Sequence, residues 1–194
     1  MKLKSKWPVR RFFAFLGVLY LFCAVTPLLF AESGTAKSES VFRIYDTATE
    51  TVRTVNDLDF LCGALPCEMA VSAPDEALKA QIIAIHTLYD RKRRENTGKD
   101  FDFTCDSAEK SIYTTDAGLT DEEQNRVRAL CLSVLDKEIY FENEPINACY
   151  FAISAGCTQP FENVWPEKSY PYLTAVACPS DLLAQGLQLS LIHI

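Results

Sequence analysis

The sequence predicts an α+β fold. Short antiparallel strands and hairpins pack against two main amphipathic helices, and one N-terminal transmembrane helix precedes them. Apolar residues recur every three or four positions in residues 75–94 and again in residues 121–137, the period of a helix with one buried face. Residues 41–45 and 52–55 are rich in β-branched and aromatic side chains and flank a turn-rich stretch, which is typical of a hairpin. Because strands and helices do not alternate regularly, a parallel α/β arrangement is disfavoured.

The N-terminal part of the chain has the pattern of a membrane anchor. Residues 1–11 contain five basic side chains and no acidic one, and residues 12–31 contain no charge. About 20 apolar residues span a bilayer, and basic residues before such a run stay in the cytoplasm. We therefore expect a single-pass cell-membrane protein whose C-terminal domain is extracytoplasmic. A cleaved signal peptide is the alternative, although this apolar run is longer than usual and Leu29-Phe30-Ala31 is a poor cleavage site.

The rest of the chain divides into a linker, a domain and a tail. Residues 32–40 are small and polar, as linkers are, and residues 41–188 form the predicted domain. The formal net charge of the chain is −7, so nucleic acid is not an expected partner. Residues 189–194 resemble a translated sequencing adapter. We expect them to be a non-native tail and the domain before them to be incomplete.

The first predicted helix, at about 75–94, has start and stop signals. Ser72 can cap its N-terminus, and Asp75 and Glu76 suit the positive end of the helix dipole. Residues 91–94 are all basic and suit the negative end.

The second predicted helix, at about 121–137, begins after a clear signal. Thr120 and Glu123 have the spacing of a capping box. Residues 96–118 between the two helices lack periodicity and are expected to be mostly loop. Four further short strands are expected at residues 139–141, 146–153, 164–165 and 172–176.

The cysteines do not form a recognisable motif. Seven of the eight follow residue 31, the number is odd, and no Cys-x-x-Cys occurs. Small buried thiols are one interpretation, and one or two disulfides are the other, because an exported domain permits them.

Few catalytic constellations are available. With His193 assigned to the tail, His86 is the only histidine, so a zinc-protease motif and a three-histidine metal site are excluded. No Gly-x-Ser-x-Gly elbow is present. A hydrolase built from Cys67 or Cys157 with His86 has no local support.

Glu68 is the strongest candidate for acid catalysis. It follows an apolar run and stands beside Pro66. Apolar surroundings raise the pKa of a carboxylic acid, and a general acid working near neutral pH needs such a rise. The alternative is a glutamate at a helix end that is exposed to water.

Two further segments could contact a ligand. The loop that contains Ser154, Gly156 and Thr158 offers hydroxyls and backbone amides for a polar groove, or it is a plain turn. Trp165 could stack on a sugar ring, or it packs in the core as most aromatic side chains do.

Four segments resemble, in order, the motifs of the stage II sporulation protein D family, the cell-wall lytic transglycosylases of endospore formers. They are residues 58–64 followed by Glu68-Met69, residues 76–81, residues 145–158, and residues 163–173 with Val164-Trp165 and Pro171-Tyr172-Leu173. The resemblance covers roughly residues 41 to 183.

The resemblance implies a function in the bacterial cell wall during sporulation and engulfment. Glu68 would be the catalytic acid, and His86, Ser154, Gly156, Thr158 and Trp165 would contact the substrate. The reaction would cleave the bond between N-acetylmuramic acid and N-acetylglucosamine in glycan strands that lack stem peptides, and leave 1,6-anhydro ends. A cell-wall amidase and an engulfment membrane protein are the implied protein partners.

Other functions remain open. A non-catalytic module could bind glycan and recruit or stimulate an amidase, and a disulfide-stapled adhesion domain is a third interpretation. The sequence departs from the family at Ala70, where a proline is usual, and at Phe151, where a histidine is frequent. Some relatives are thought to hold zinc near this loop. With Phe151 present we expect no metal site and no cofactor.

Overall fold

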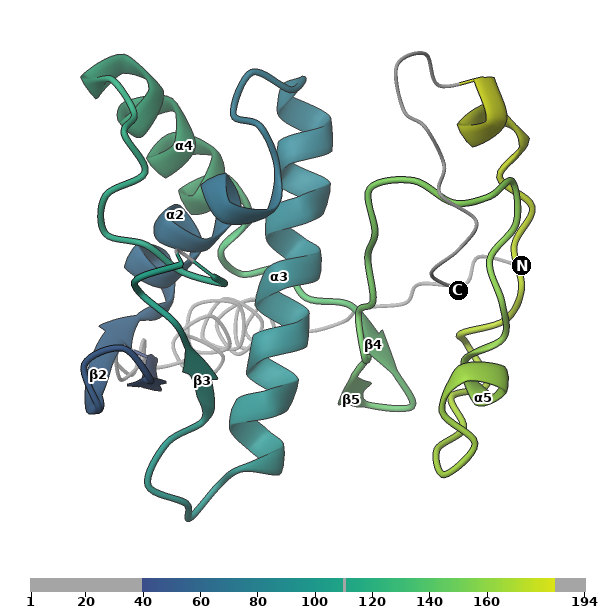
Figure 1. The fold of residues 1–194 in the computed structure, drawn as a ribbon. Helices are drawn as coiled ribbons and strands as arrows, with labels where there is room; N and C mark the ends of the chain where they lie inside the picture. The colour runs from purple at the N-terminus through teal and green to yellow at the C-terminus, as the bar shows by residue number, and fades with distance from the viewer. Residues whose placement is uncertain (1–39, 110, 184–194) are drawn as a thin grey trace, which may run out of the picture. The chain divides into compact units, whose positions relative to one another are not determined.

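The computed structural model describes residues 40–109 and 111–183 (Figure 1). The predicted segments 1–11, 12–31 and 189–194, and nearly all of the linker 32–40, lie outside the described residues. The elements below therefore belong to the predicted domain.

A three-stranded sheet has its first strand in the middle. Strands β1 (Val41–Asp46) and β2 (Thr51–Asn56) pair antiparallel, with Val41 opposite Asn56, so the predicted hairpin is confirmed. Strand β3 (Phe103–Cys105) pairs with β1 in parallel, which gives the order β2-β1-β3.

Residues 96–118 are mostly loop, as predicted, and β3 is a short strand within them that the sequence did not reveal. Asp102 fixes its position, because its carboxylate accepts hydrogen bonds from the Arg43 backbone N–H at 2.7 Å and from the Arg43 guanidinium at 2.6 Å. A three-residue strand is too short to show a period of its own.

Helix α2 (Asp57–Glu68) is a third main helix that the sequence did not reveal. Asn56 caps it by accepting a hydrogen bond from the Asp59 backbone N–H at 2.8 Å. Its five buried residues follow one another closely in the sequence and therefore lie on several sides of the helix. Without a continuous polar face, the sequence shows no helical period there. Pro66 lies in its last turn, where the ring disturbs few hydrogen bonds.

The two predicted amphipathic helices are confirmed. Helix α3 (Asp75–Glu95) begins after Pro74 with no side-chain cap, so Ser72 does not cap it. Helix α4 (Asp121–Val134) begins with the predicted Thr120–Glu123 capping box and ends about one turn earlier than expected. Figure 1 shows α2 and α4 beside the long α3, and all three helices contact one another.

The core lies between these helices and the sheet. It is built around an aromatic cluster in which ring centroids are 4.5 to 5.7 Å apart, formed by Phe42, Phe60, Tyr89 and Phe103. Helix α4 contributes Val127, Leu130, Cys131 and Val134 to the same cluster of buried residues.

The chain after α4 has little regular structure. Strands β4 (Tyr140–Phe141) and β5 (Glu144–Pro145) form a small hairpin, so a strand near 139–141 is confirmed. They are followed by helix α5 (Phe161–Val164) and the 3-10 turn η1 (Pro179–Leu183). The other predicted strands were wrong: residues 146–153 and 172–176 pair with no strand, and Val164-Trp165 ends a helix.

The membrane prediction also needs correction. No helix within residues 40–109 and 111–183 is long and apolar enough to cross a bilayer. Helix α3 has the length, at 21 residues, but it carries several charged side chains at both ends. The fold class of the described residues is therefore α+β with no membrane-spanning helix, and the predicted transmembrane segment, residues 12–31, lies outside them. The single-pass membrane localisation is corrected on the same ground.

Candidate active site around Glu68

Glu68 is the last residue of α2 and is exposed to solvent. The helix ends there because Met69 has extended backbone angles, while its N–H still donates to the Leu65 carbonyl oxygen. The side chain is therefore open to water and is not enclosed as the neighbouring apolar sequence led us to expect. An exposed carboxylate at the end of a helix can be reached by a large substrate.

Tyr150 lies beside Glu68, although the two residues are far apart in the sequence. Burial raises the pKa of the Tyr150 phenol, and the charge of Glu68 together with a hydrogen bond between the two side chains raises it further. The phenol therefore keeps its proton near neutral pH and can donate it to the Glu68 carboxylate. Tyr150 is half-buried and stands just before the loop that carries Ser154.

Two residues of α3 complete the surroundings of Glu68. Burial raises the pKa of Tyr89, and the charge of Glu68 adds to the rise. Burial lowers the pKa of Lys92, while the charge of Glu68 opposes this effect. The Lys92 ammonium also lies 4.5 Å from the centre of the Tyr89 ring. Glu68 thus has a hydroxyl donor and a cation within electrostatic reach.

Sequence reasoning did not single out Tyr150 or Lys92. Tyr150 is one of several tyrosines near the loop, and Lys92 is one of four consecutive basic residues at a helix end. Lys92 approaches Glu68 through the packing of α2 against α3, and Tyr150 approaches it from the irregular segment after β5.

His86 lies in the interior, with only 4% of its surface exposed. Its Nε2 atom is 3.4 Å from Asp57 Oδ2 and 3.7 Å from Glu138 Oε1. Its Nδ1 atom is buried and has no hydrogen-bond partner among the described residues. The structure therefore places His86 between two partly buried carboxylates and not beside Glu68.

His86 belongs to a larger network of charged side chains, which we call the α3 ion network. Arg93 pairs with Asp57 at 2.9 Å and also with Asp90, which is 3% exposed. Arg94 pairs with the same Asp90 at 2.6 Å. Buried charges need such partners because desolvation is costly.

The loop at residues 154–158 is tied to the chain at residues 176–181. The Asp181 carboxylate accepts hydrogen bonds from the Ser154 backbone N–H at 2.8 Å and from its hydroxyl at 2.6 Å, which lowers the pKa of Asp181. Thr158 exchanges two hydrogen bonds with Val176, one through its side chain. Gly156, between them, has a φ of +90°, which favours glycine.

The hydroxyls of Ser154 and Thr158, which we expected to line a polar groove, take part in these hydrogen bonds instead. Ser154 and Thr158 hold the loop in shape, and Tyr150 is the member of this segment that meets Glu68. The plain-turn interpretation therefore accounts for the loop's own hydrogen bonds.

Trp165 belongs to an aromatic row near α5. It is 47% exposed and stacks on Phe161, with ring centroids 4.6 Å apart. Tyr170 meets Phe161 edge-on at 4.9 Å, and the Arg91 guanidinium lies 5.2 Å above the Tyr170 ring. An exposed indole on a supported row presents a flat apolar face.

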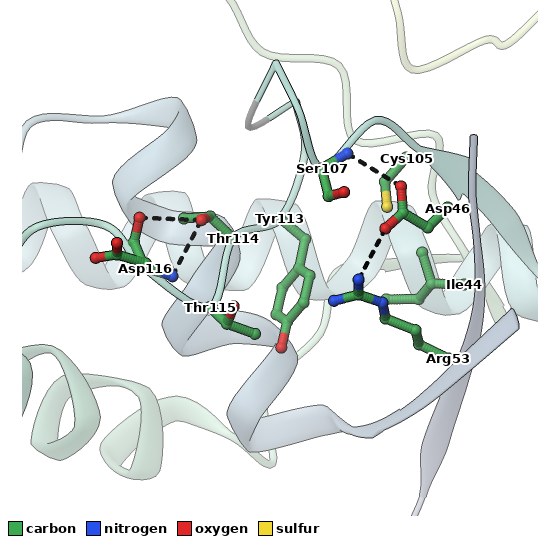
Figure 2. Close-up of a pocket in the computed structure, with 9 residues that line it drawn as sticks. All are labelled: Ile44, Asp46, Arg53, Cys105, Ser107, Tyr113, Thr114, Thr115 and Asp116. Atoms are coloured by element: carbon green, nitrogen blue, oxygen red, sulfur yellow. Dashed lines mark hydrogen bonds and ion pairs between the residues drawn. The ribbon is translucent and has the colours of Figure 1, made fainter. Parts of the chain in front are cut away.

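Two cavities lie on either side of the segment Tyr113–Asp116, and Glu68 lines neither of them. The smaller, of about 170 Å³, contains the buried Asp46. Figure 2 shows the Asp46 carboxylate directed at the Arg53 guanidinium, 3.0 Å away, and at the Ser107 backbone N–H. Hydrogen bonding to Ser107 is the main cause that lowers the pKa of Asp46 to about 2.

A metal centre finds no suitable residues in the described part of the chain. No group of three His, Cys, Asp or Glu side chains within residues 40–109 and 111–183 is placed to hold an ion. Phe151, at the position where relatives often have histidine, is 57% exposed and offers no ligand.

Comparisons with known proteins agree with the motifs found in the sequence. Residues 45–134, which include Glu68, match the family model described as SpoIID, stage II sporulation protein. Stage II sporulation protein D of Bacillus subtilis (strain 168) is 26% identical over 148 residues, which cover 71% of this chain. That of Bacillus amyloliquefaciens is 27% identical over 161 residues, or 78% of this chain. The chain spans less than half of these relatives, 43% and 46% of their lengths. The domain match and the two relatives agree that this chain is similar to the stage II sporulation protein D family over most of its length.

Proposed function

We propose that the chain is a lytic transglycosylase that cleaves peptidoglycan glycan strands during sporulation, with Glu68 as its catalytic acid. One observation carries the proposal: the Glu68 carboxylate is exposed at the end of α2 and lies beside the Tyr150 hydroxyl. The two residues come from two different segments that resemble the family. The substrate would be strands without stem peptides, because nothing bulky then hinders the approach of the glycan to Glu68.

A single carboxylic acid can complete this reaction, whereas ordinary glycosidases use two. Protonated Glu68 would donate its proton to the oxygen that links N-acetylmuramic acid to N-acetylglucosamine, and the bond to C1 of the muramic residue would break. The Glu68 carboxylate would then accept the proton of the 6-hydroxyl of the same sugar as that oxygen attacks C1. A 1,6-anhydro ring forms, Glu68 regains its proton, and no water is consumed.

The neighbours of Glu68 have defined parts in this scheme. The Tyr150 phenol would hydrogen-bond to the carboxylate and fix its orientation, which general acid catalysis requires. The Lys92 ammonium would stabilise the carboxylate between the two steps, when it carries a full charge. Both are positioning residues in this proposal.

The test is mass spectrometry of the products formed from stem-peptide-free glycan strands. The full chain should release 1,6-anhydro products, and Glu68→Gln should release none, because the amide has no acidic proton to donate. Glu76→Gln is the matched control: Glu76 is an exposed glutamate of α3 that pairs with Lys79 at 2.7 Å and has no place in the mechanism. Tyr150→Phe should lower the rate and leave the products unchanged.

The outcomes separate the enzyme from other functions. Loss of products in Glu68→Gln but not in Glu76→Gln supports the proposal. Equal activity of Glu68→Gln and the unmodified chain would refute the role of Glu68. If a folded chain that binds the strands yields no product, the enzyme proposal is abandoned.

The exposed aromatic row supports a second candidate function. Trp165 could stack on sugar rings, and a module that only binds glycan could recruit or stimulate a cell-wall amidase, with an engulfment membrane protein as a further partner. In that case Trp165→Ala should weaken glycan binding and amidase stimulation, while Glu68→Gln leaves both unchanged.

A further inference from the structure

Two cysteines lie on the helices α2 and α4, which pack against each other. Cys62 of α2 is half-buried, and Cys131 of α4 is completely buried. Both thiols are free. The ion pair between Asp59 of α2 and Arg128 of α4, at 3.0 Å, joins the two helices three residues before each cysteine. Neither cysteine has a part in the function proposed above, so the pair needs an explanation of its own.

The two thiols differ in their access to solvent. Cys62 lines the larger cavity, of about 420 Å³, together with Asp59, Tyr113 and Arg128. This volume is within the range of small-molecule sites. Cys131 stands behind Cys62 in the core and does not line the cavity. A reagent in the cavity would therefore meet Cys62 first.

The two thiols also differ in their acidity. The hydrogen bond from Cys131 lowers the pKa of Cys62, and the positive charge of Arg128 lowers it further. The same hydrogen bond and burial raise the pKa of Cys131. Because the thiolate is the nucleophile in thiol–disulfide exchange, Cys62 is the one prepared to attack. Arg128 is half-exposed and pairs with Asp59 at 3.0 Å.

We propose that Cys62 and Cys131 are a redox-active thiol pair, which a low-molecular-weight disulfide in the cavity oxidises to a disulfide between α2 and α4. This proposal does not depend on the reaction assigned to Glu68.

The exchange balances in two steps. The Cys62 thiolate attacks one sulfur of the small disulfide, whose sulfur–sulfur bond breaks, and the first small thiolate leaves and takes up a proton. A mixed disulfide remains on Cys62. The Cys131 sulfur then attacks the Cys62 sulfur and expels the second small thiolate, which receives the Cys131 proton. Two protein thiols are oxidised, and one small disulfide is reduced to two thiols.

The full chain treated with oxidised glutathione provides the test. After an acid quench, free thiols are alkylated under unfolding conditions, disulfides are reduced, and the released thiols are alkylated with a heavier reagent. Peptide mapping then reads each cysteine separately, and peptide mapping of a sample that is not reduced shows which cysteines retain glutathione. We expect Cys62 and Cys131 to become protected together, with no glutathione retained on either. The exposed Cys149 and Cys157 serve as internal reference for simple glutathionylation.

Three variants assign the order of events. Cys131→Ser should stop at the mixed disulfide and keep glutathione on Cys62. Cys62→Ser should leave Cys131 unprotected, because the buried thiol cannot reach the reagent. Cys105→Ser removes another buried thiol, in β3, and should leave the Cys62–Cys131 disulfide unaffected.

The unmodified chain decides the question even where a variant fails to fold. Joint protection of both residues, with a melting temperature several degrees above that of the reduced chain, supports the proposal, since the bond closes a loop of roughly seventy residues. A Cys131 that stays free, or glutathione that stays on Cys62, would overturn it.

Discussion

Replacement of Gly63 by alanine tests the packing of α2 against the segment that follows β3. A Cβ atom on Gly63 would lie within 3.0 Å of the Thr114 carbonyl oxygen and of two carbons of the Tyr113 ring. Gly63 is buried in the interior of the helix, so its role is this close approach and not an unusual backbone conformation. The Gly63 carbonyl oxygen also accepts a hydrogen bond from the Thr114 backbone N–H at 3.2 Å.

Two opposing effects set the size of the change. Alanine is favoured over glycine inside a helix by about 1 kcal/mol. Overpacking of a filled site costs about 1–3 kcal/mol, and the loss of a hydrogen bond costs about 1 kcal/mol more. The Thr114 carbonyl belongs to the backbone and cannot rotate away as a side chain could. We therefore expect Gly63→Ala to lower the free energy of unfolding by about 1–3 kcal/mol.

Urea denaturation followed by circular dichroism measures this change. Ala129→Gly, at an exposed position of α4, is the matched control and should lose about 1 kcal/mol from helix propensity alone. If Gly63→Ala were as stable as the unmodified chain, or more stable, Tyr113 and Thr114 would not pack on α2 as described. The two cavities that this segment lines would then not have the shape described above.

Three further predictions concern the core and the charged groups. Phe60→Ala should lower the free energy of unfolding, measured by chemical denaturation, by about 3–5 kcal/mol, because the ring is fully buried in the centre of the aromatic cluster. A decrease below about 1 kcal/mol would contradict that packing. Asp90→Ala should lower the free energy of unfolding by about 3 kcal/mol, because it leaves the Arg93 and Arg94 guanidinium groups without their shared carboxylate. We do not expect Asp90→Glu to restore this stability, because the site is too enclosed for the longer side chain. Because the pKa of Asp46 is lowered from 3.8 to about 2, its contribution to stability is complete above pH 3.8 and is lost as the pH falls toward 2. Asp46→Asn should therefore flatten the decline of the unfolding free energy between these pH values, and an unchanged slope would contradict the buried contact.

The parts of the fold that the sequence predicted are those fixed by local signals. Helices α3 and α4 have long apolar periods, and Thr120 with Glu123 marks the start of α4 within one turn of chain. The hairpin of β1 and β2 is equally local. Each of these elements can be recognised without knowledge of what lies beside it.

The parts that the sequence did not predict depend on distant partners. Helix α2 is buried on several faces and so has no amphipathic pattern, and β3 is positioned by the contact of Asp102 with Arg43. The expected strand at residues 146–153 has apolar residues but no neighbouring strand to pair with. A strand is defined by its partner, which sequence periodicity does not contain.

The same division applies to the candidate site. The position of Glu68 followed from family motifs, but its exposure depends on how α2 ends. Tyr150 and Lys92 were missed because they approach Glu68 only through tertiary packing. His86 was expected to contact substrate, yet Asp57 and Glu138, from two other parts of the chain, enclose it.

The position of β1 between β2 and β3 has a consequence for how the chain folds. Strand β2 follows β1 after a turn at residues 47–50, whereas β3 begins only after α2 and α3. Pairings between distant residues pay a larger loop-closure entropy and form more slowly. Pulse-labelled hydrogen exchange should therefore protect the amides between β1 and β2 before those between β1 and β3. Until β3 docks, the free edge of β1 can pair with another chain. The Arg43–Asp102 contact ends this risk of association, because it holds β3 against β1.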